Sequence, residues 1–224
     1  MNFKTLVPAL LLAATSTGFG VMSTAGTAHA TTSQTTVSVA EIGKAAPAFT
    51  LMDTDGKKVS LADFKGKTVV LEWFCPTCPY SGGRGGDKSI HASGRVGALM
   101  TAMKKVDPDA VYLLIDSSTV KMRTTAEKLA EQDAAIKKKL GITAPILIDA
   151  DTGVAKAYGA KATPHVFVID GEGVLRYHGA FDDQRRGGSE LGNNYVLTSV
   201  TAIKKGEKVE PTYVKQYGCG VRTN

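Results

Sequence analysis

The chain has 224 residues, of which 43% are hydrophobic, and its formal net charge is +6 at pH 7. This is enough apolar sequence to bury one core of ordinary size, so we expect a single folded domain. The basic residues are scattered apart from short runs at 137–139 and 204–205, which argues against a nucleic-acid-binding surface. Three cysteines are too few to hold together a small disulfide-framed domain.

The first 30 residues have the pattern of a secretory signal peptide. Lys4 supplies a positive charge, residues 6–14 are apolar, and Ala28-His29-Ala30 offers small residues for a signal peptidase. The apolar run is shorter than the roughly 20 residues that a membrane-spanning helix needs. We therefore predict cleavage near Ala30, a periplasmic or secreted location, and no stable membrane insertion after cleavage. Residues 31–40 are predicted to be a flexible leader to a domain at 41–224.

The first half of that domain begins with β-type patterns. A hairpin is predicted at 48–61, followed by a short helical turn at 61–64. The β-rich run 68–74 ends directly at the first two cysteines. Four glycines within 81–86 disfavour a helix there, and a regular helix is predicted to resume over about 87–105.

The second half alternates strands and helices. We predict strands at 110–115 and 145–148, helices at 124–140, 154–158 and about 191–204, a hairpin at 165–178, and a tail from about 207. The predicted fold is α/β, with a central mixed sheet covered by helices on both faces.

Cys75-Pro76-Thr77-Cys78 has the spacing of dithiol redox chemistry. Between a buried strand and a helix, the first sulfur would lie near unpaired backbone N–H groups and the positive end of the helix dipole, which favours the thiolate. The second thiol would then be close enough to resolve a mixed disulfide, and Pro76 would stiffen the spacer. The alternative is a disulfide that only fastens the strand to the helix.

Neighbouring residues are further candidates for the site. Glu72 is expected either to exchange a proton with a thiol as a partly buried carboxylate, or to pair with Lys67. Trp73 either packs in the core or contacts substrate. His165 either faces the cysteines or points outward from its strand. No cofactor or metal site is predicted.

Three segments of the chain resemble the thioredoxin superfamily. They are Trp73-Phe74-Cys75-Pro76-Thr77-Cys78-Pro79, Ala162-Thr163-Pro164-His165-Val166-Phe167-Val168-Ile169-Asp170 and Tyr217-Gly218-Cys219. The closest resemblance is to its exported redoxin branch, which borders on the peroxiredoxins, and it covers about residue 42 to the C-terminus. It implies a thioredoxin-like fold with an N-terminal β-hairpin extension. It also implies a cis peptide between Thr163 and Pro164, with the Thr163 backbone free to pair with an extended substrate. Substrate contacts are then expected from Trp73, Pro76, Thr77, Thr163 and Pro164.

The chain departs from this branch at two places. Many members carry Asn where Cys75 stands and keep only the cysteine that matches Cys78, so Cys78 is the other candidate for the principal thiol. The glycine-rich stretch replaces one that is usually charged and helical, which weakens the helix-dipole argument. Cys219 either resolves a disulfide or sulfenic acid on Cys78, or is a free thiol shielded by packing.

Three functions are consistent with these features. The first is an exported thiol-disulfide oxidoreductase that acts on protein or small-molecule disulfides together with a redox partner protein. The second is a thiol peroxidase in which Cys219 resolves Cys78, although the Thr or Ser that peroxiredoxins place three residues before the active cysteine is absent. The third is a copper chaperone similar to the Sco-type proteins, which space their cysteines one residue wider and use a His that no residue here clearly matches.

Overall fold

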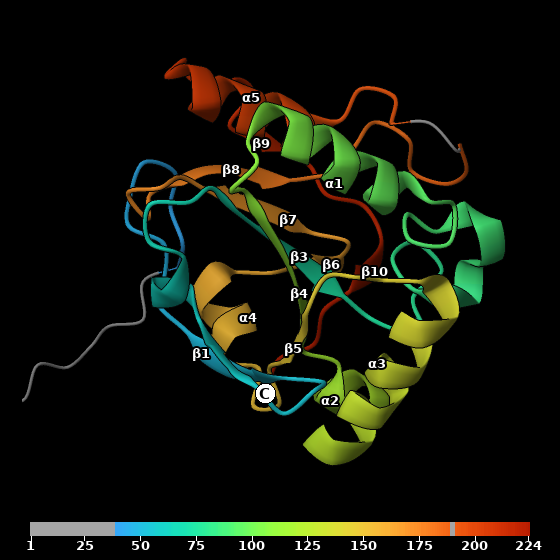
Figure 1. The fold of residues 1–224 in the computed structure, drawn as a ribbon. Helices are drawn as coiled ribbons and strands as arrows, with labels where there is room; N and C mark the ends of the chain where they lie inside the picture. Colours follow the sequence, from blue (N-terminus) through green and yellow to red (C-terminus); the bar gives the residue numbers. More distant parts are fainter. Residues whose placement is uncertain (1–38, 189–190) are drawn as a thin grey trace, which may run out of the picture. The chain divides into compact units, whose positions relative to one another are not determined.

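The computed structural model describes residues 39–188 and 191–224, so the predicted signal peptide and most of the predicted leader lie outside the described residues. Its main sheet has the strand order β2-β1-β5-β4-β3-β7-β8-β9, and β6 and β10 form a separate pair (Figure 1). The strands are β1 (Thr50–Asp53), β2 (Lys58–Ser60), β3 (Val69–Phe74), β4 (Val111–Asp116), β5 (Ile146–Ile148), β6 (Ala162–Thr163), β7 (Val166–Ile169), β8 (Leu175–Gly179), β9 (Tyr213–Val214) and β10 (Cys219–Gly220). The helices are η1 (Leu61–Phe64), η2 (Gly83–Lys88), α1 (Arg95–Val106), α2 (Thr119–Met122), α3 (Ala126–Leu140), α4 (Gly153–Tyr158) and α5 (Tyr195–Lys205).

Strand β3 lies at the centre of the sheet and delivers the first two cysteines. It pairs in parallel with β4 and antiparallel with β7. All six of its residues are buried, because helices and loops cover both faces of the sheet and five of the six side chains are apolar. The mixed sheet predicted from the sequence is therefore present.

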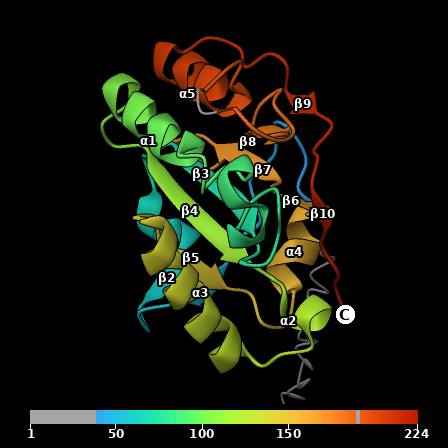
Figure 2. The same ribbon diagram turned by 90° about the vertical axis from the view of Figure 1, so that its right-hand side faces the viewer.

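Apolar side chains form a layer on each face of the sheet. One layer joins residues of α1 and α5 to one side of β3, β4 and β7, with Ile136 of α3 packed against it. The other joins α4 and the β1–β2 hairpin to the opposite side of the same strands. Helices α1 and α5 lie side by side (Figures 1 and 2).

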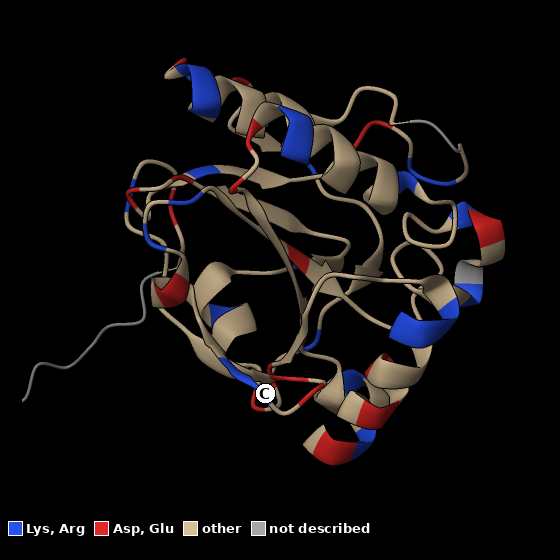
Figure 3. Cartoon of the chain, viewed as in Figure 1, with Lys and Arg blue, Asp and Glu red and all other residues tan. Residues whose placement is uncertain are grey.

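Charge and capping explain the polar helix α3. Its acidic residues lie in its first half and most of its lysines in its last turn, and both kinds of charge are seen along it (Figure 3). The Thr125 side chain caps its N-terminus by accepting a hydrogen bond from the Lys128 N–H, and Gly141 ends it in the left-handed conformation. Its last turn carries the lysines at 137–139, where positive charge complements the helix dipole.

Most elements predicted from the sequence are present, with one clear difference. The helix predicted from residue 87 begins at Arg95, after a 3-10 segment and Gly94, which has φ +80°. The short elements α2, β6, β9 and β10 are absent from the prediction. Two of these, β9 and β10, belong to the tail after α5, which runs along one side of the fold to the C-terminus (Figure 2).

Within residues 39–188 and 191–224, no helix is both long enough and apolar enough to span a membrane.

Candidate active site

Cys78 is the best-connected of the three thiols. Its Sγ donates a hydrogen bond to the main-chain oxygen of Thr163 at 3.0 Å and accepts one from the Tyr80 N–H at 3.4 Å. The peptide between Thr163 and Pro164 is cis, as the family resemblance implies. The Cys78 side chain is only 1% exposed, so the thiol lies beneath the surface of the fold.

The C-terminal strand brings Cys219 to the same place. β10 pairs antiparallel with β6, so that Cys219 lies opposite Thr163. The Thr163 hydroxyl also donates a hydrogen bond to the Cys219 main-chain oxygen at 3.4 Å. Gly218 permits this close approach: its φ is +122°, and an added Cβ would lie 2.1 Å from the Thr163 oxygen. Cys78, Thr163 and Cys219 thus form one cluster although they are far apart in the sequence.

The two thiols of this cluster differ in acidity. Burial disfavours the Cys78 thiolate. Hydrogen bonds from the Thr163 side chain, from the main chain of Tyr80 and Ser81, and from the Cys219 side chain outweigh this effect and lower the pKa of Cys78. Burial and the hydrogen bond with Cys78 raise the pKa of Cys219 to about 11. Of these two thiols Cys78 is therefore the more acidic and loses its proton first, which suits it as the nucleophile.

No α-helix begins directly after the cysteines, in agreement with the glycine-rich stretch, so the helix-dipole argument for Cys75 is wrong. The chain turns sharply instead, with the Gly82 N–H bonded to the Cys78 oxygen at 2.9 Å and the Gly83 N–H to the Pro76 oxygen at 3.0 Å. A Cβ on Gly82 would lie 2.2 Å from the Cys75 oxygen, so this turn requires glycine. The main chain of Tyr80 and Ser81 supplies the hydrogen bonds at the Cys78 sulfur that a helix N-terminus would otherwise have offered.

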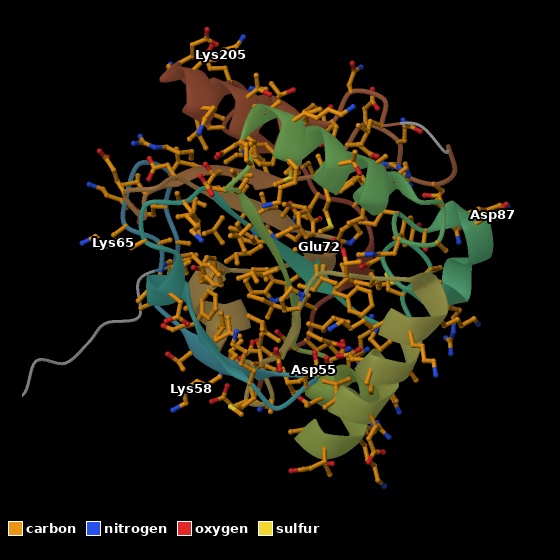
Figure 4. All side chains as sticks on the ribbon, in the orientation of Figure 1. Asp55, Lys58, Lys65, Glu72, Asp87 and Lys205 are labelled. Atoms are coloured by element: carbon orange, nitrogen blue, oxygen red, sulfur yellow. The ribbon has the colours of Figure 1, made fainter. Side chains whose placement is uncertain are left out.

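Glu72 holds this turn in place. The side chain is fully buried in the interior of the fold (Figure 4). Its carboxylate accepts hydrogen bonds from the Ser81 hydroxyl at 2.9 Å and the Tyr112 hydroxyl at 2.7 Å, and its Oε2 lies 3.1 Å from the His91 Nε2. The predicted pairing with Lys67 is therefore wrong: the partners of Glu72 come from β4 and from the loop after Cys78. The predicted exchange of a proton with a thiol stays a prediction.

A second buried network fixes the tail that carries Cys219. The Tyr217 hydroxyl donates to Asp182 Oδ1 at 2.6 Å, and the fully buried Arg95 guanidinium donates to Asp182 Oδ2 at 2.5 Å. The Gln184 N–H also donates to Asp182 Oδ1 at 3.0 Å. Tyr217 thus anchors the chain two residues before Cys219 to the first turn of α1. Sequence analysis missed Arg95 and Asp182, because only the fold brings these positions together.

Cys75 lies in a different environment. It is fully buried, and its Sγ lies 3.5 Å from the Thr77 hydroxyl. Nearby, burial, the Asp116 charge and the Cys75 charge raise the pKa of Asp133 to about 10, and burial raises the pKa of Asp116 to about 7. These two carboxyl groups keep at least one proton at neutral pH. All three cysteines are free thiols in this structure.

The residues predicted to contact substrate are mostly covered. Trp73 is fully buried against Tyr158 and Phe167, and its indole N–H donates to the Ser117 hydroxyl at 3.1 Å. Trp73 therefore packs in the core, and its contact with substrate stays a prediction. Pro76 and Pro164 are buried and Thr77 is half-buried. The backbone of Thr163 is not free as predicted, because β10 already pairs with it.

His165 lies inside the fold, so the prediction that it points outward is wrong. It is 2% exposed, accepts a hydrogen bond from the Lys161 N–H at Nδ1, and lies with its Nε2 3.4 Å from the His178 Nδ1. Burial and the charges of His178 and Lys161 lower the pKa of His165 to about 3, so this imidazole is neutral at physiological pH. Across the described part of the chain, no three His, Cys, Asp or Glu side chains gather as a metal site. The copper alternative gains no support there.

The profile of the Redoxin family matches residues 41–194, which is more than half of the chain. The chain belongs to the Redoxin family. A thiol-disulfide oxidoreductase ResA of Bacillus thuringiensis subsp. konkukian is 30% identical over 145 residues, covering 60% of this chain and 67% of that relative. A Mycobacterium tuberculosis protein whose name proposes a peroxiredoxin is 31% identical over 137 residues, covering 60% and 73%.

Solved structures agree with the fold of this Redoxin-family chain. A hypothetical protein of Sinorhizobium meliloti superimposes with a TM-score of 0.66 at 29% identity, covering 82% of this chain and 95% of that one. An uncharacterised protein of Geobacillus kaustophilus also gives a TM-score of 0.66, at 23% identity. The predicted redoxin-branch fold and a thiol oxidoreductase activity are thereby confirmed at the level of the family.

Proposed function

We propose that this chain is an exported thiol-disulfide oxidoreductase whose catalytic pair is Cys78 and Cys219. The observation that carries the proposal is the cluster in which a Cys78 thiol of lowered pKa lies beside Thr163 and the strand bearing Cys219. The signal-peptide pattern at the N-terminus supports the exported location. This pairing differs from the Cys75–Cys78 pairing that the C-x-x-C spacing suggests.

The reaction has two exchange steps. The Cys78 thiolate attacks one sulfur of a substrate disulfide, which breaks the substrate S–S bond, forms a mixed disulfide and releases one substrate thiolate. The Cys219 thiol then loses its proton and attacks the Cys78 sulfur, so the Cys78–Cys219 disulfide forms and the second substrate thiolate leaves and takes up a proton. The substrate is reduced by two electrons. A dithiol of the redox partner protein restores both thiols by the same exchange in reverse.

The tail both resolves and covers the site. Cys78 is 1% exposed, and β10 consists of only two residues. A strand this short separates from its partner at low free-energy cost compared with the core strands, so its opening admits substrate and its return brings Cys219 back to Cys78.

Disulfide mapping of the purified protein after oxidation by one equivalent of substrate tests this proposal. We expect a Cys78–Cys219 disulfide in the parent chain and in Cys75→Ser. In Cys219→Ser with Cys75→Ser, we expect a trapped mixed disulfide on Cys78. A Cys75–Cys78 disulfide as the main product, with full turnover in Cys219→Ser, would instead establish the C-x-x-C pair as catalytic.

Peroxide reduction is a second candidate, and the placement of Cys219 favours it. The Cys78 thiolate would attack a peroxide oxygen to give a sulfenic acid and an alcohol or water, and the Cys219 thiol would condense with it to the same disulfide and release water. Rapid-mixing oxidation with hydrogen peroxide distinguishes the two. A rate no higher than that of a free thiol at the same pH would leave disulfide exchange as the function.

A further inference from the structure

An open groove of about 780 Å³ lies along the tail beside the cysteine cluster. On one side it begins at Tyr80, two residues after Cys78. On the other it is bounded by Tyr217, Gly218 and Gly220, which surround Cys219 in the chain. A molecule held in this groove lies next to the segment that must move to expose Cys78.

The charge of the groove is predominantly positive. Lys161, Arg185 and Arg186 line it and are exposed. Among the described residues, none of these three forms an ion pair with a protein carboxylate. The Arg186 guanidinium lies 4.9 Å from the centre of the Tyr80 ring. This contact holds the positive charge of Arg186 at the end of the groove that is nearest to Cys78 in the sequence. Asp183 is the one acid among the described residues that line the groove, and it accepts a hydrogen bond from the Asn193 amide at 2.7 Å.

Two more cations lie near the same strand. Lys121 and Arg222 line a small cavity of about 10 Å³ that also borders Thr163 and Gly220. Positive charge therefore lies close to Cys219 and β10 outside the groove as well as within it. Such a field raises the local concentration of anions and their rate of encounter with the site.

The tail also restricts how a substrate can approach. Because β10 pairs with β6, a protein strand cannot add to the Thr163 edge while the tail is in place. The groove stays open in that state. A small molecule can therefore bind before the tail moves, whereas a peptide strand must first displace it.

We propose that this groove binds the carboxylates of low-molecular-weight anionic disulfides and so selects them as substrates. The inference rests on the proposed disulfide exchange and specifies the substrate class. Arg185, Arg186 and Lys161 pair with the carboxylates, and the Tyr80 and Tyr217 rings border the bound molecule. The disulfide then meets Cys78 when β10 separates from β6.

The test compares three small disulfides that differ in charge: glutathione disulfide, which is anionic, 2-hydroxyethyl disulfide, which is neutral, and cystamine, which is cationic. We expect kcat/KM to fall in that order at low salt, and the three values to converge at high salt because exposed charges are screened. Arg185→Ala with Arg186→Ala lowers kcat/KM for the anionic disulfide by roughly 3- to 10-fold, the effect of losing two exposed charge pairs. The same variant leaves the rate with the neutral disulfide unchanged.

A matched control removes two positive charges elsewhere. Lys65→Ala with Lys205→Ala lowers the net charge equally at two exposed positions that do not line the groove, both labelled in Figure 4. We expect it to leave the preference among the three disulfides unchanged. Equal rates for anionic and neutral disulfides in the parent chain, an equal loss of both in the double arginine variant, or a higher rate with an acidic protein disulfide than with all three would overturn the proposal.

Binding of an unreactive anion separates this inference from the proposed function. S-methylglutathione carries the carboxylates but no disulfide or free thiol. Calorimetry therefore measures its binding to the groove without any disulfide exchange. Salt-sensitive binding that weakens in the double arginine variant supports the groove even if no disulfide turns over. Absence of binding would contradict the proposed role of the groove. It would not affect the proposed Cys78–Cys219 exchange, which the disulfide mapping tests separately.

Discussion

The Cys78 thiol donates its hydrogen bond to the main-chain oxygen of Thr163, the residue that also pairs with Cys219. The proposed nucleophile is therefore in direct contact with the residue to which the strand bearing Cys219 is attached. When Cys78 ionises it loses its proton and cannot donate to this carbonyl. The thiolate then depends on the hydrogen bonds from the Thr163 side chain, from the main chain of Tyr80 and Ser81, and from Cys219.

Replacing Cys219 should make Cys78 less acidic. In a Cys75→Ser background, we expect Cys219→Ala to move the pH midpoint of Cys78 alkylation upward by roughly one pH unit, since a hydrogen bond to a charged group contributes about 1.5 kcal/mol. Cys219→Ser keeps a hydroxyl donor and should shift the midpoint less. Iodoacetamide kinetics followed by mass spectrometry measure both, and identical midpoints in the two variants would contradict the Cys219 hydrogen bond.

Replacing Tyr217 should loosen the tail. Tyr217→Phe removes the hydroxyl that donates to the buried Asp182, and we expect the free energy of unfolding to fall by about 1–3 kcal/mol. We also expect slower closure of the Cys78–Cys219 disulfide, because the tail loses its anchor two residues before Cys219. Urea unfolding and quenched-flow mapping measure the two effects. Tyr213→Phe is the control, because Tyr213 is exposed and its hydroxyl donates a long hydrogen bond to Gln216 at 3.4 Å, so the substitution should change neither.

Replacing Glu72 separates a structural role from a catalytic one. Glu72→Gln weakens a buried network with His91, Ser81 and Tyr112, and we expect the free energy of unfolding to fall by about 1–3 kcal/mol, because buried polar groups lose a hydrogen-bond partner. Tyr112→Phe removes only one hydrogen bond of the same network and should cost less. If Glu72 also holds the main chain of Ser81 at the sulfur, the pH midpoint of Cys78 alkylation rises in Glu72→Gln. An unchanged midpoint would limit Glu72 to stability.

The pKa values of Asp133 and Asp116 predict how stability depends on pH. Burial raises the pKa of Asp133 to about 10, and a pKa above the unfolded value means that the folded state binds the proton more tightly. Its contribution is therefore greatest at acidic pH and declines as pH rises from about 4 toward the folded pKa. We expect Asp133→Asn to remove this decline and to stabilise the chain at pH 8 by about 1 kcal/mol or more, since one pKa unit corresponds to about 1.4 kcal/mol. Thermal unfolding from pH 5 to 8 measures it, and a parallel loss of stability at every pH would show that the carboxyl group is not protonated.

The sequence predicted the parts of the fold whose signal is local. Runs of β-branched and aliphatic residues identified the central strands β3, β4 and β7, because strands covered on both faces must be apolar throughout. The glycine run after Cys78 indicated that no helix forms there. It could not indicate why the turn needs glycine at position 82. The reason is that a Cβ there would lie 2.2 Å from the Cys75 oxygen.

The site was harder to predict because its partners are distant in the sequence. Cys78, Cys219 and Glu72 were candidates on the basis of residue type and resemblance. The C-x-x-C spacing favoured Cys75 as the partner of Cys78, because spacing describes only local geometry. The contacts of Cys78 with Thr163 and Cys219, and of Glu72 with His91 and Tyr112, follow from strand pairing and packing, which no local pattern encodes.

The pairing of β10 with β6 and of β9 with β8 also bears on how copies of the chain behave toward one another. Unpaired backbone groups at a sheet edge can template the addition of a strand from another molecule. Here the last residues of the same chain occupy both positions. Any event that releases the tail, such as proteolysis, exposes both sheet edges at once. The segment that carries Cys219 therefore also covers two edges at which another copy of the chain could add a strand.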